Sequence, residues 1–302
     1  MSTPKSARGS HRPRTIVLVG ATSGIGRMAA RQLSAGGHRL IVVGRDQGRG
    51  KALAAELRRA GSAGVSRPPA VFIAGDVSTR AGIEAVVREI RTHTDTVDTL
   101  VNNAGVMLGH RQLTSEGLEM NFAVHHLAPY TTTALLLPLL ARGDGRIVNT
   151  NSEGHRMTMS GAGGIDVDFG DLQSERHYSM FLTYSRTKLE NLLFTYEFHR
   201  RFPQFSIVAV HPGVVRSRLM RGVRNPAMWL LNKVGRVLLM RPSQGAVPIV
   251  RLATAAAVEN GRYYDRFVPT PSSAQSMSPL TAKRLWEVTE RLRGPIDSQA
   301  RG

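Results

Sequence analysis

Tyr184 and Lys188 are the residues of this 302-residue chain whose types and spacing best suit acid–base chemistry. They stand four positions apart, and the apolar Leu189, Leu192 and Leu193 beside them predict a helix. On a helix this spacing brings the phenol and the ammonium to one face. A lysine cation stabilises a phenolate and lowers a tyrosine pKa from about 10 toward neutrality. The pair therefore indicates a proton donor and acceptor, although a Tyr/Lys pair on a helix is by itself usually inert.

A glycine-rich turn stands between the first predicted strand, 15–20, and a helical pattern over 25–35. Its spacing is Gly-x-x-x-Gly-x-Gly, which lets the backbone turn sharply and approach a pyrophosphate closely. The N-terminus of the following helix offers free N–H groups to phosphates. We therefore predict a dinucleotide site, although a plain strand-to-helix turn also explains a lone glycine cluster. The residues expected to contact the cofactor here are Gly20, Thr22, Ser23, Gly24, Ile25 and Gly26.

The second predicted strand ends at Gly44, and Arg45 and Asp46 follow it. An NAD-dependent enzyme typically places a carboxylate at this strand end to bind the ribose 2′-hydroxyl. Here glycine stands at that place, and the Arg45 guanidinium can bind a 2′-phosphate, which a carboxylate would repel. The sequence therefore favours NADP(H) over NAD(H). Asp46 keeps NAD(H) open unless it only caps the next helix.

Candidate ligand-binding residues also follow the third and fourth predicted strands. Asp76, with Val77 next to it, stands where a side chain can reach an adenine ring, and a role as an N-cap or turn residue fits equally well. Asn103, Ala104 and Gly105 follow the fourth strand, at the edge where open parallel sheets bind ligands. A turn alone also explains this run. Its placement favours a role in lining the cofactor site.

These motifs occur in the order found in short-chain dehydrogenases/reductases (SDRs), which the chain resembles over about residues 15–268. Further matches are Ser152 after the fifth predicted strand and His211-Pro212-Gly213-Val214-Val215 after the sixth. The resemblance is closest to the branch similar to retinol dehydrogenases, on the run Tyr184–Phe194, Gln244-Gly245-Ala246 and Gly261-Arg262-Tyr263-Tyr264. The departures from the family pattern are Val19, Asn151 and Thr187, where Thr, Ser and Ser are usual.

The resemblance implies an enzyme that interconverts an alcohol and an aldehyde or ketone. Tyr184 would exchange the proton, and Ser152 would hydrogen-bond the substrate oxygen. Lys188 would lower the pKa of Tyr184 and hold the nicotinamide ribose. Asn121 would complete a proton relay through the helix backbone and a water, while the cofactor would supply the hydride. The residues that the resemblance adds to the cofactor site are Pro212, Gly213 and Val215, besides Tyr184 and Lys188.

Apolar runs rich in Val and Ile alternate with longer helical patterns along the chain. The predicted strands are 15–20, 39–44, 70–75, 98–101, 145–150, 205–211 and 262–267. The predicted helices include 25–35, 46–60, 79–93, 115–140 and 179–201. This alternation predicts an α/β fold: one Rossmann-type domain over 15–295, with a doubly wound parallel sheet and helices on both faces. The basic start, 1–14, and the end, 296–302, are expected to be flexible tails.

Residues 216–241 carry seven Lys/Arg and no Asp or Glu. Asn225-Pro226 predicts an N-cap followed by proline, starting a helix that continues to about Met240. In the resembled family the segment after Pro212-Gly213 covers the substrate, so 214–241 is expected to form a lid over a lipophilic substrate. Its apolar side chains are Met228, Trp229, Leu230, Val234 and Leu238. A basic helix on an anionic membrane and a packing or subunit-contact helix are two other interpretations.

Composition limits the remaining classes. The chain has no cysteine, which excludes disulfides, thiolate metal sites and cysteine nucleophiles and suits a cytoplasmic protein. No apolar run reaches the roughly 18 residues that suggest a membrane span. Asp166, Asp168 and Asp171 lack the glycine turn and glutamate of a calcium loop, and the histidines lack metal-ligand spacing. We therefore predict no metal site.

The net charge of +18 raises a different alternative, a protein that binds nucleic acid or a membrane surface through charge. Because the Lys and Arg residues are scattered and not interleaved with aromatic residues, nucleic acid is not expected as a partner. Another alternative is a catalytically silent NADP-binding regulatory protein, against which the intact set of four catalytic candidates argues. The expected partners are a small lipophilic carbonyl or alcohol substrate and further copies of the chain, in a dimer or tetramer.

Overall fold

The computed structural model describes residues 12–61, 69–156, 164–215 and 239–296. An eight-stranded sheet forms its centre, in the order β3-β2-β1-β4-β5-β6-β7-β8. The strands from β3 to β7 run parallel, and β8 pairs antiparallel with β7 at the edge. The strands are β1 (Thr15–Val19), β2 (Arg39–Gly44), β3 (Val71–Ala74), β4 (Thr99–Asn102), β5 (Arg146–Thr150), β6 (Ser206–His211), β7 (Arg262–Asp265) and β8 (Val268–Pro269).

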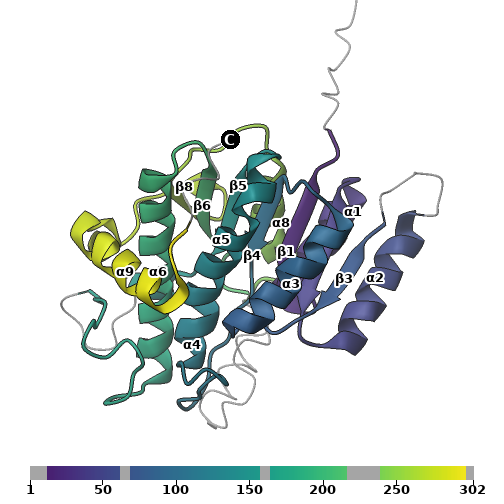
Figure 1. Cartoon of the computed structure of the whole chain (residues 1–302). Coiled ribbons are helices and arrows are strands. Elements are labelled where there is room, and N and C mark those ends of the chain that lie inside the picture. Colours follow the sequence, from purple (N-terminus) through teal and green to yellow (C-terminus); the bar gives the residue numbers. More distant parts are fainter. Residues whose placement is uncertain (1–11, 62–68, 157–163, 216–238, 297–302) are drawn as a thin grey trace, which may run out of the picture.

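Helices pack on both faces of the sheet (Figure 1). One face carries α1 (Gly24–Ala35), α2 (Gln47–Gly61) and α8 (Pro242–Thr254), and the other carries α3 (Arg80–His93), α5 (Ala128–Ala141), α6 (Met180–Arg201) and α9 (Pro279–Arg293). Side chains alternate along β1, where Ile16 and Leu18 pack toward the first set and Val17 and Val19 toward the second. The doubly wound α/β fold predicted from the sequence is therefore confirmed.

All seven predicted strands are present, each within two residues of its predicted ends. The strand β8 was not predicted, because two residues are too short for a periodic signal. Two short 3-10 turns, Glu153–Arg156 and Ala274–Met277, complete the regular structure of the described residues. None of the helices in that part of the chain is both long enough and apolar enough to cross a membrane.

The predicted helix 115–140 is wrong in its first part. The chain forms a turn at Gly117 and then α4 (Met120–Phe122), a π-helix (Ala123–Leu127) and α5. Helix formation begins at Met120 because the Glu119 carboxylate accepts the Phe122 N–H, at 2.8 Å. The π-turn precedes Pro129, which has no N–H to donate to the His125 carbonyl. That carbonyl is therefore free for a bond from outside the helix.

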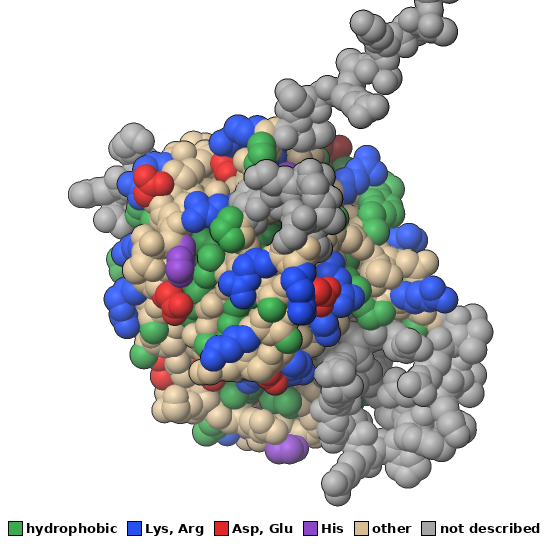
Figure 2. Space-filling view, turned by 90° about the vertical axis from the view of Figure 1, so that its right-hand side faces the viewer, with side chains coloured by type: hydrophobic (Ala, Val, Ile, Leu, Met, Phe, Trp, Pro, Cys, Tyr) green, Lys and Arg blue, Asp and Glu red, His purple; other side chains and the backbone are tan. Residues whose placement is uncertain are grey.

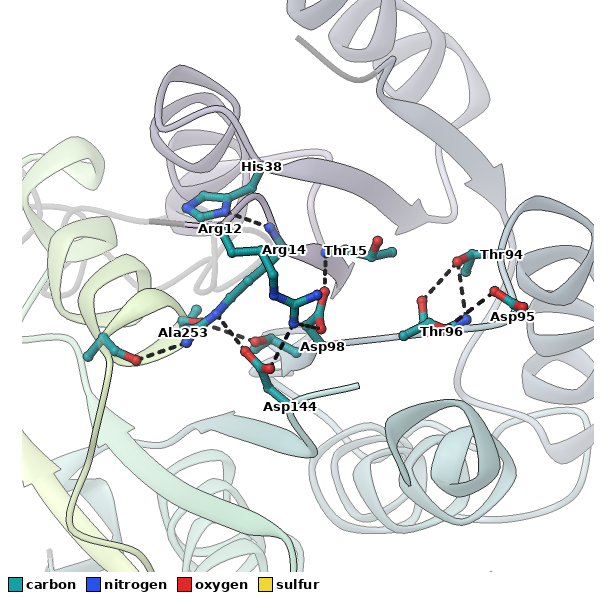
Figure 3. A network of polar contacts seen from close by, with 12 residues as sticks. Arg12, Arg14, Thr15, His38, Thr94, Asp95, Thr96, Asp98, Asp144 and Ala253 are labelled. Atoms are coloured by element: carbon teal, nitrogen blue, oxygen red, sulfur yellow. Dashed lines mark hydrogen bonds and ion pairs between the residues drawn. The ribbon is translucent and has the colours of Figure 1, made fainter. Parts of the chain in front are cut away.

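The ends of the described chain belong to the folded domain. Arg12 contacts Asp98 at 2.6 Å and Asp144 at 2.8 Å, and Arg14 pairs with Asp144 at 2.9 Å (Figure 3). Asp98 also accepts the Thr15 N–H at 2.7 Å. Ile296 is buried in the core. The flexibility expected of 1–14 and 296–302 thus does not extend to residues 12–14 or to Ile296, and 1–11 and 297–302 lie outside the described residues.

The basic charge is dispersed over the described part of the face that Figure 2 shows. Figure 2 shows Lys and Arg side chains scattered over one face, with hydrophobic and acidic side chains between them. Several are paired, as where Glu56 contacts Arg27 at 3.0 Å and Arg31 at 2.5 Å. A dispersed distribution lacks the continuous basic stripe typical of nucleic-acid binding.

Candidate active site

The glycine-rich turn packs against the end of β4 so closely that side chains do not fit. A Cβ at Gly20 would lie 2.6 Å from the Cα of Ala104, and one at Gly26 would lie 2.2 Å from the Gly20 carbonyl oxygen. Gly24 differs: its φ is +54°, and a Cβ there would meet no atom within 4 Å. Gly24 is therefore needed for its left-handed backbone and leaves open space at the start of α1, as a phosphate requires.

Asn103 fixes the position of this turn. Its side-chain amide donates to the Gly20 carbonyl at 3.1 Å, and its Oδ1 accepts the Thr150 hydroxyl at 3.3 Å. Its backbone N–H donates to Val19 at 3.0 Å. The structure thus brings the predicted Asn103-Ala104-Gly105 segment against the glycine turn, with the Asn103 side chain as a brace between β1, β4 and β5.

The end of β2 leaves no room for an acidic residue. A Cβ at Gly44 would lie 2.5 Å from Cγ2 of Thr22, so a side chain there would displace Thr22. Arg45, the next residue, is exposed. Asp46 accepts the backbone N–H of Arg49 at 2.8 Å and pairs with its side chain at 2.8 Å. The hydrogen bond from the Arg49 backbone lowers the pKa of Asp46. Asp46 therefore caps α2, one of its two expected roles.

Asp76 and Val77 lie between β3 and α3. The Asp76 Oδ1 accepts the Ser78 N–H at 3.0 Å, as in an Asx turn, and the side chain is exposed. The N-cap of α3 is instead Thr79, which accepts the Gly82 N–H at 3.1 Å. Val77 is buried in the hydrophobic core. Only the backbone of Val77 is thus available to a ligand, while one Asp76 oxygen serves the turn.

Ser152, Tyr184 and Lys188 come together at the carboxyl ends of β5 and β6, as predicted. The Ser152 Oγ accepts the Gly154 N–H at 3.1 Å, and the Tyr184 side chain lies beside Ser152 and Gly154. The Lys188 ammonium lies 5.7 Å from the centre of the Tyr184 ring and donates to the Thr150 carbonyl at 3.0 Å. Gly154 permits this approach, since a Cβ there would lie 3.0 Å from the Tyr184 ring.

The electrostatics of this group are set by burial. Burial raises the pKa of Tyr184, and the hydrogen bond with Ser152 opposes that rise. Burial also lowers the pKa of Lys188 to about 8. The direction for Tyr184 is opposite to the lowering predicted from the Tyr/Lys spacing, because loss of solvation disfavours the phenolate and the ammonium contacts Thr150 instead of the phenol oxygen.

Asn121 is fully buried at the start of the π-helix region. Its Nδ2 donates to Glu119 at 2.7 Å and to the Tyr178 hydroxyl at 3.3 Å. Its Oδ1 has no hydrogen-bond partner among the described residues. The side chain thus does not contact Tyr184. The ring that packs edge-on against the Tyr184 ring is that of His125, with centroids 5.4 Å apart.

Asn151, which the sequence shows only as a departure from the family pattern, links Ser152 to α6 in the structure. Its amide donates to Asn191 on α6 at 2.9 Å and accepts the Ser152 N–H at 2.7 Å. Asn191 in turn donates to the His125 carbonyl that the π-turn leaves free, at 2.8 Å. This chain of buried amides links β5, α6 and the π-helix, and therefore fixes the spacing of Ser152 from the helix that carries Tyr184.

The remaining predicted positions lie at the entry to the segment that continues beyond Val215. Gly213 has φ +91°, and a Cβ there would lie 2.6 Å from the Met240 sulfur. Val215, which follows this turn, forms a parallel β-bridge with Met240. The two ends of 214–241 thus meet beside the site. The predicted helix from Asn225 and the lid side chains within 216–238 lie outside the described residues.

Two of the three aspartates between Ser152 and Tyr184, Asp168 and Asp171, bind groups of the protein itself. Asp171 accepts the backbone N–H groups of Glu175 at 2.7 Å and Arg176 at 3.1 Å, and Asp168 lies 3.7 Å from Arg186. Asp166 is exposed. In the part of the chain that the structure describes, no three His, Asp or Glu side chains form a group that could hold a metal.

Comparison with known proteins identifies the family of this chain. A family model described as short chain dehydrogenase matches residues 14–227. The chain belongs to the short-chain dehydrogenase/reductase family. Retinol dehydrogenase 14 of Homo sapiens is 32% identical over 297 residues, which cover 93% of this chain and 86% of that protein. A Streptomyces sp. (strain C5) protein named as a daunorubicin C-13 ketoreductase is 34% identical over 279 residues, 91% of each.

A solved structure adds support for the fold. The crystal structure of an uncharacterized protein from Mycobacterium Paratuberculosis is 26% identical and superposes with a TM-score of 0.69, over 93% of each chain. This SDR is therefore an oxidoreductase of the class that interconverts alcohols and carbonyl compounds, in a family that binds NAD or NADP. The resemblance to retinol dehydrogenases is confirmed.

Proposed function

We propose that this SDR uses NADP(H) to interconvert a lipophilic alcohol and its aldehyde or ketone, with Tyr184 as the proton donor and acceptor. The observation that carries the proposal is that the Tyr184 and Ser152 side chains lie together against Gly154, with the Lys188 ammonium 5.7 Å from the centre of the Tyr184 ring. Two hydroxyls that converge beside a cation suit a carbonyl oxygen that gains negative charge as it is reduced.

In the reduction direction Tyr184 gives its proton to the carbonyl oxygen while Ser152 holds that oxygen by a hydrogen bond. Because burial raises the pKa of Tyr184, the phenol keeps its proton until the substrate oxygen becomes basic enough to take it. The phenolate left behind is stabilised by the Lys188 cation. When bound, the cofactor supplies the hydride that goes to the carbonyl carbon. Asn121 is proposed to support the return of a proton to Tyr184 through the helix that it begins.

The cofactor would lie along the carboxyl ends of the strands. The glycine turn, including Thr22, Ser23 and Ile25, would receive the pyrophosphate, since Gly24 leaves open space at the N-terminus of α1. Asp76 and the Val77 backbone would lie along the adenosine, and Asn103, Ala104 and Gly105 beneath the cofactor. The segment Pro212 to Val215 would lie beside the nicotinamide, with Tyr184 and Lys188 at the ribose. The fit rests on the cradle that the glycines form.

The preference for NADP(H) rests on the end of β2. Position 44 has no space for a carboxylate against Thr22, and the Asp46 carboxylate is engaged by Arg49. Arg45 is exposed there, and no ion-pair partner is found for it among the described residues. An available guanidinium without a neighbouring free carboxylate favours a 2′-phosphate over a 2′-hydroxyl.

The lipophilic substrate is inferred from the relatives and from the apolar side chains of the segment expected to cover the site. The relatives are named for retinol and for a daunorubicin ketone. The apolar side chains predicted for 214–241 suit a lid over such a molecule. We further propose a cytoplasmic homo-oligomer, a dimer or tetramer, in which the same basic segment makes at most a peripheral membrane contact.

The test compares the wild type with Tyr184→Phe, following NADPH oxidation with hydrophobic aldehydes, ketones and quinones. The substitution removes only the hydroxyl, so we expect the rate to fall about 10²- to 10⁴-fold, with the protein still folded and still binding NADPH. A Tyr184→Phe enzyme as fast as the wild type would refute the mechanism. Tight binding of NADPH without turnover of any compound would instead favour the regulatory alternative.

A further inference from the structure

Two histidines that take no part in the proposed proton transfer lie against it from two sides. His125, in the π-helix, is 1% exposed, and His155, in the 3-10 turn after Ser152, is 0% exposed. Buried histidines are costly unless both ring nitrogens find partners. In each of these rings both nitrogens do, and the partners decide which nitrogen carries the proton.

The hydrogen bonds of His125 determine its tautomer. Its Nε2 receives the backbone N–H of Val106 at 3.1 Å, so Nε2 has a lone pair and no proton. Its Nδ1 lies 2.8 Å from the Thr187 hydroxyl oxygen. Thr187 donates its single proton to the Tyr184 carbonyl, at 2.9 Å, and can therefore only accept from the ring. His125 is thus neutral, with its proton on Nδ1, and its bond reaches the Tyr184 backbone through Thr187.

His155 has the same pattern on the other side of the site. Its Nε2 receives the backbone N–H of Ser273 at 3.2 Å, and its Nδ1 lies 2.7 Å from the Ser152 carbonyl oxygen. Because a carbonyl oxygen only accepts, the Nδ1 carries the proton here too. The ring also packs edge-on against Tyr263, with centroids 5.0 Å apart. His155 therefore holds the backbone of Ser152 as His125 holds that of Tyr184.

His126, the neighbour of His125, provides the contrast. It is equally buried, at 1% exposed, but its Nε2 contacts the Thr289 hydroxyl at 2.7 Å. Thr289 donates to the Leu285 carbonyl at 2.7 Å, so it accepts from Nε2, and His126 carries its proton on that nitrogen. Its bonds lead to α9, away from Tyr184. The two adjacent histidines thus have opposite tautomers, and their side chains hydrogen-bond to different helices, His125 to α6 and His126 to α9.

We propose that His125, acting through Thr187, and His155 are positioning residues, which as neutral Nδ1–H tautomers hold the Tyr184 and Ser152 side chains beside each other. The proposal rests on the proposed function. Tyr184 and Ser152 lie on separate elements, α6 and the loop after β5, so each backbone needs its own anchor. The edge-on contact of His125 with the Tyr184 ring adds an anchor for the phenol itself.

The surroundings of both rings favour the neutral form. Burial and the Lys188 cation lower the pKa of His125, whose ring also contacts Thr187 and the Tyr184 ring. Burial also lowers the pKa of His155, and Arg156 and His211 act in the same direction while Glu153 opposes them. Protonating either Nε2 would break its bond from a backbone N–H. Both imidazole rings are therefore expected to stay neutral.

The first test reads the tautomers directly and does not depend on catalysis. In the full-length protein with ¹⁵N-labelled histidine at pH 7, long-range ¹H–¹⁵N spectra distinguish Nδ1–H from Nε2–H rings, with assignments from single His→Gln variants. We expect Nδ1–H for His125 and His155 and Nε2–H for His126. An Nε2–H or doubly protonated ring at 125 or 155 would overturn the proposal, even if the protein proved to be an active reductase.

The second test measures positioning, using two threonines in matched roles. Thr187→Val removes the hydroxyl between His125 and Tyr184, and Thr289→Val removes the equivalent hydroxyl beside His126. A displacement of reacting groups costs about 10- to 100-fold in rate. We therefore expect Thr187→Val to lower kcat by about that factor with the KM for NADPH little changed, and Thr187→Ser to restore it. Thr289→Val should leave kcat unchanged while lowering the melting temperature.

His155 is tested in parallel. His155→Phe removes both bonds, and His155→Asn keeps an amide N–H to donate to the Ser152 carbonyl. We expect the Phe variant to lose kcat as Thr187→Val does and the Asn variant to recover part of it. Equal kcat values for the Thr187→Val and Thr289→Val enzymes would overturn the role of His125 even if His125 variants fail to fold. A wild type that reduces no carbonyl refutes the proposed function, and the tautomers then still decide whether these anchors exist.

Discussion

The two edges of the sheet use different polar chemistry. At the amino ends of the strands, Asp98 and Asp144 are paired with Arg12 and Arg14 (Figure 3). At the carboxyl ends, neutral amides and hydroxyls dominate, and no described carboxylate forms an ion pair with the Lys188 ammonium. The amino edge thus pairs Asp98 and Asp144 with arginines and binds the buried Arg146 guanidinium to backbone carbonyls, whereas the carboxyl edge keeps the Lys188 ammonium without an ion-pair partner among the described residues.

This difference separates the part of the molecule that stabilises the fold from the part proposed to do chemistry. A buried charge without a partner destabilises the folded state, and the lowered pKa of Lys188 expresses that cost. A buried lysine whose pKa is shifted and whose position faces a ligand site is a candidate functional group. Substitutions at the two edges should therefore change different properties, stability at one and activity at the other.

Asp98→Ala tests the amino edge and should have the largest effect on stability. The carboxylate is nearly fully buried and binds both Arg12 and the Thr15 N–H. Because Arg12 is largely exposed, most of the loss comes from the unpaired Thr15 N–H and the lost charge-assisted bond, and we expect about 2–3 kcal/mol in the free energy of unfolding. Urea titration measures it.

The control is Asp98→Asn, which keeps an oxygen for the Thr15 N–H and should lose about half as much. Both variants should retain the wild-type kcat, and Tyr184→Phe should show the reverse pattern, with normal stability and little activity. If Asp98→Ala reduced kcat as strongly as it reduced stability, the two edges would not be independent and the comparison would fail.

Arg45→Ala tests the NADP(H) preference proposed for the carboxyl edge. Removal of a charge-assisted bond to a 2′-phosphate costs about 1.5–3 kcal/mol, so we expect the KM for NADPH to rise about 10- to 100-fold. The KM for NADH should stay within about twofold, since NADH lacks that phosphate. Asp46→Asn is the matched control and should change neither value, because Asp46 caps α2. A wild-type preference for NADH, retained in Arg45→Ala, would contradict the assignment.

Much of the fold was predictable because its signals are local. The predicted strand 39–44 matched β2 at both ends, and the doubly wound parallel sheet followed from the βαβ alternation. The grouping of Ser152, Tyr184 and Lys188 was predictable from the family resemblance. Motif spacing thus located the proposed catalytic group, since each residue follows a strand or shares one helical face.

Other features depend on contacts that no spacing encodes. The π-turn at Ala123–Leu127 arises where Pro129 lacks an N–H, and periodicity does not distinguish it from an α-helix. His125 and His155 belong to no motif that the sequence shows, and only their hydrogen-bond partners indicate a role. The pKa of Tyr184 was predicted to fall because the spacing with Lys188 was visible and the burial was not.

The last expected effect concerns pH, which should change activity and stability in opposite ways through a single residue, Lys188. The pKa of Lys188 is about 8 in the folded protein against 10.5 for an exposed lysine. Below pH 8 the ammonium is present, so kcat/KM should be level there and fall about tenfold per pH unit above it. The unfolded state binds more protons between pH 8 and 10.5, so the contribution of Lys188 to stability rises over that window, by up to about 1.4 kcal/mol per unit. Activity and stability should therefore change in opposite directions between pH 8 and 10.5.

The control is Lys188→Arg, which stays charged over this range. The fall in kcat/KM near pH 8 should disappear in this variant, and a fall that persisted unchanged would assign the titration to another group.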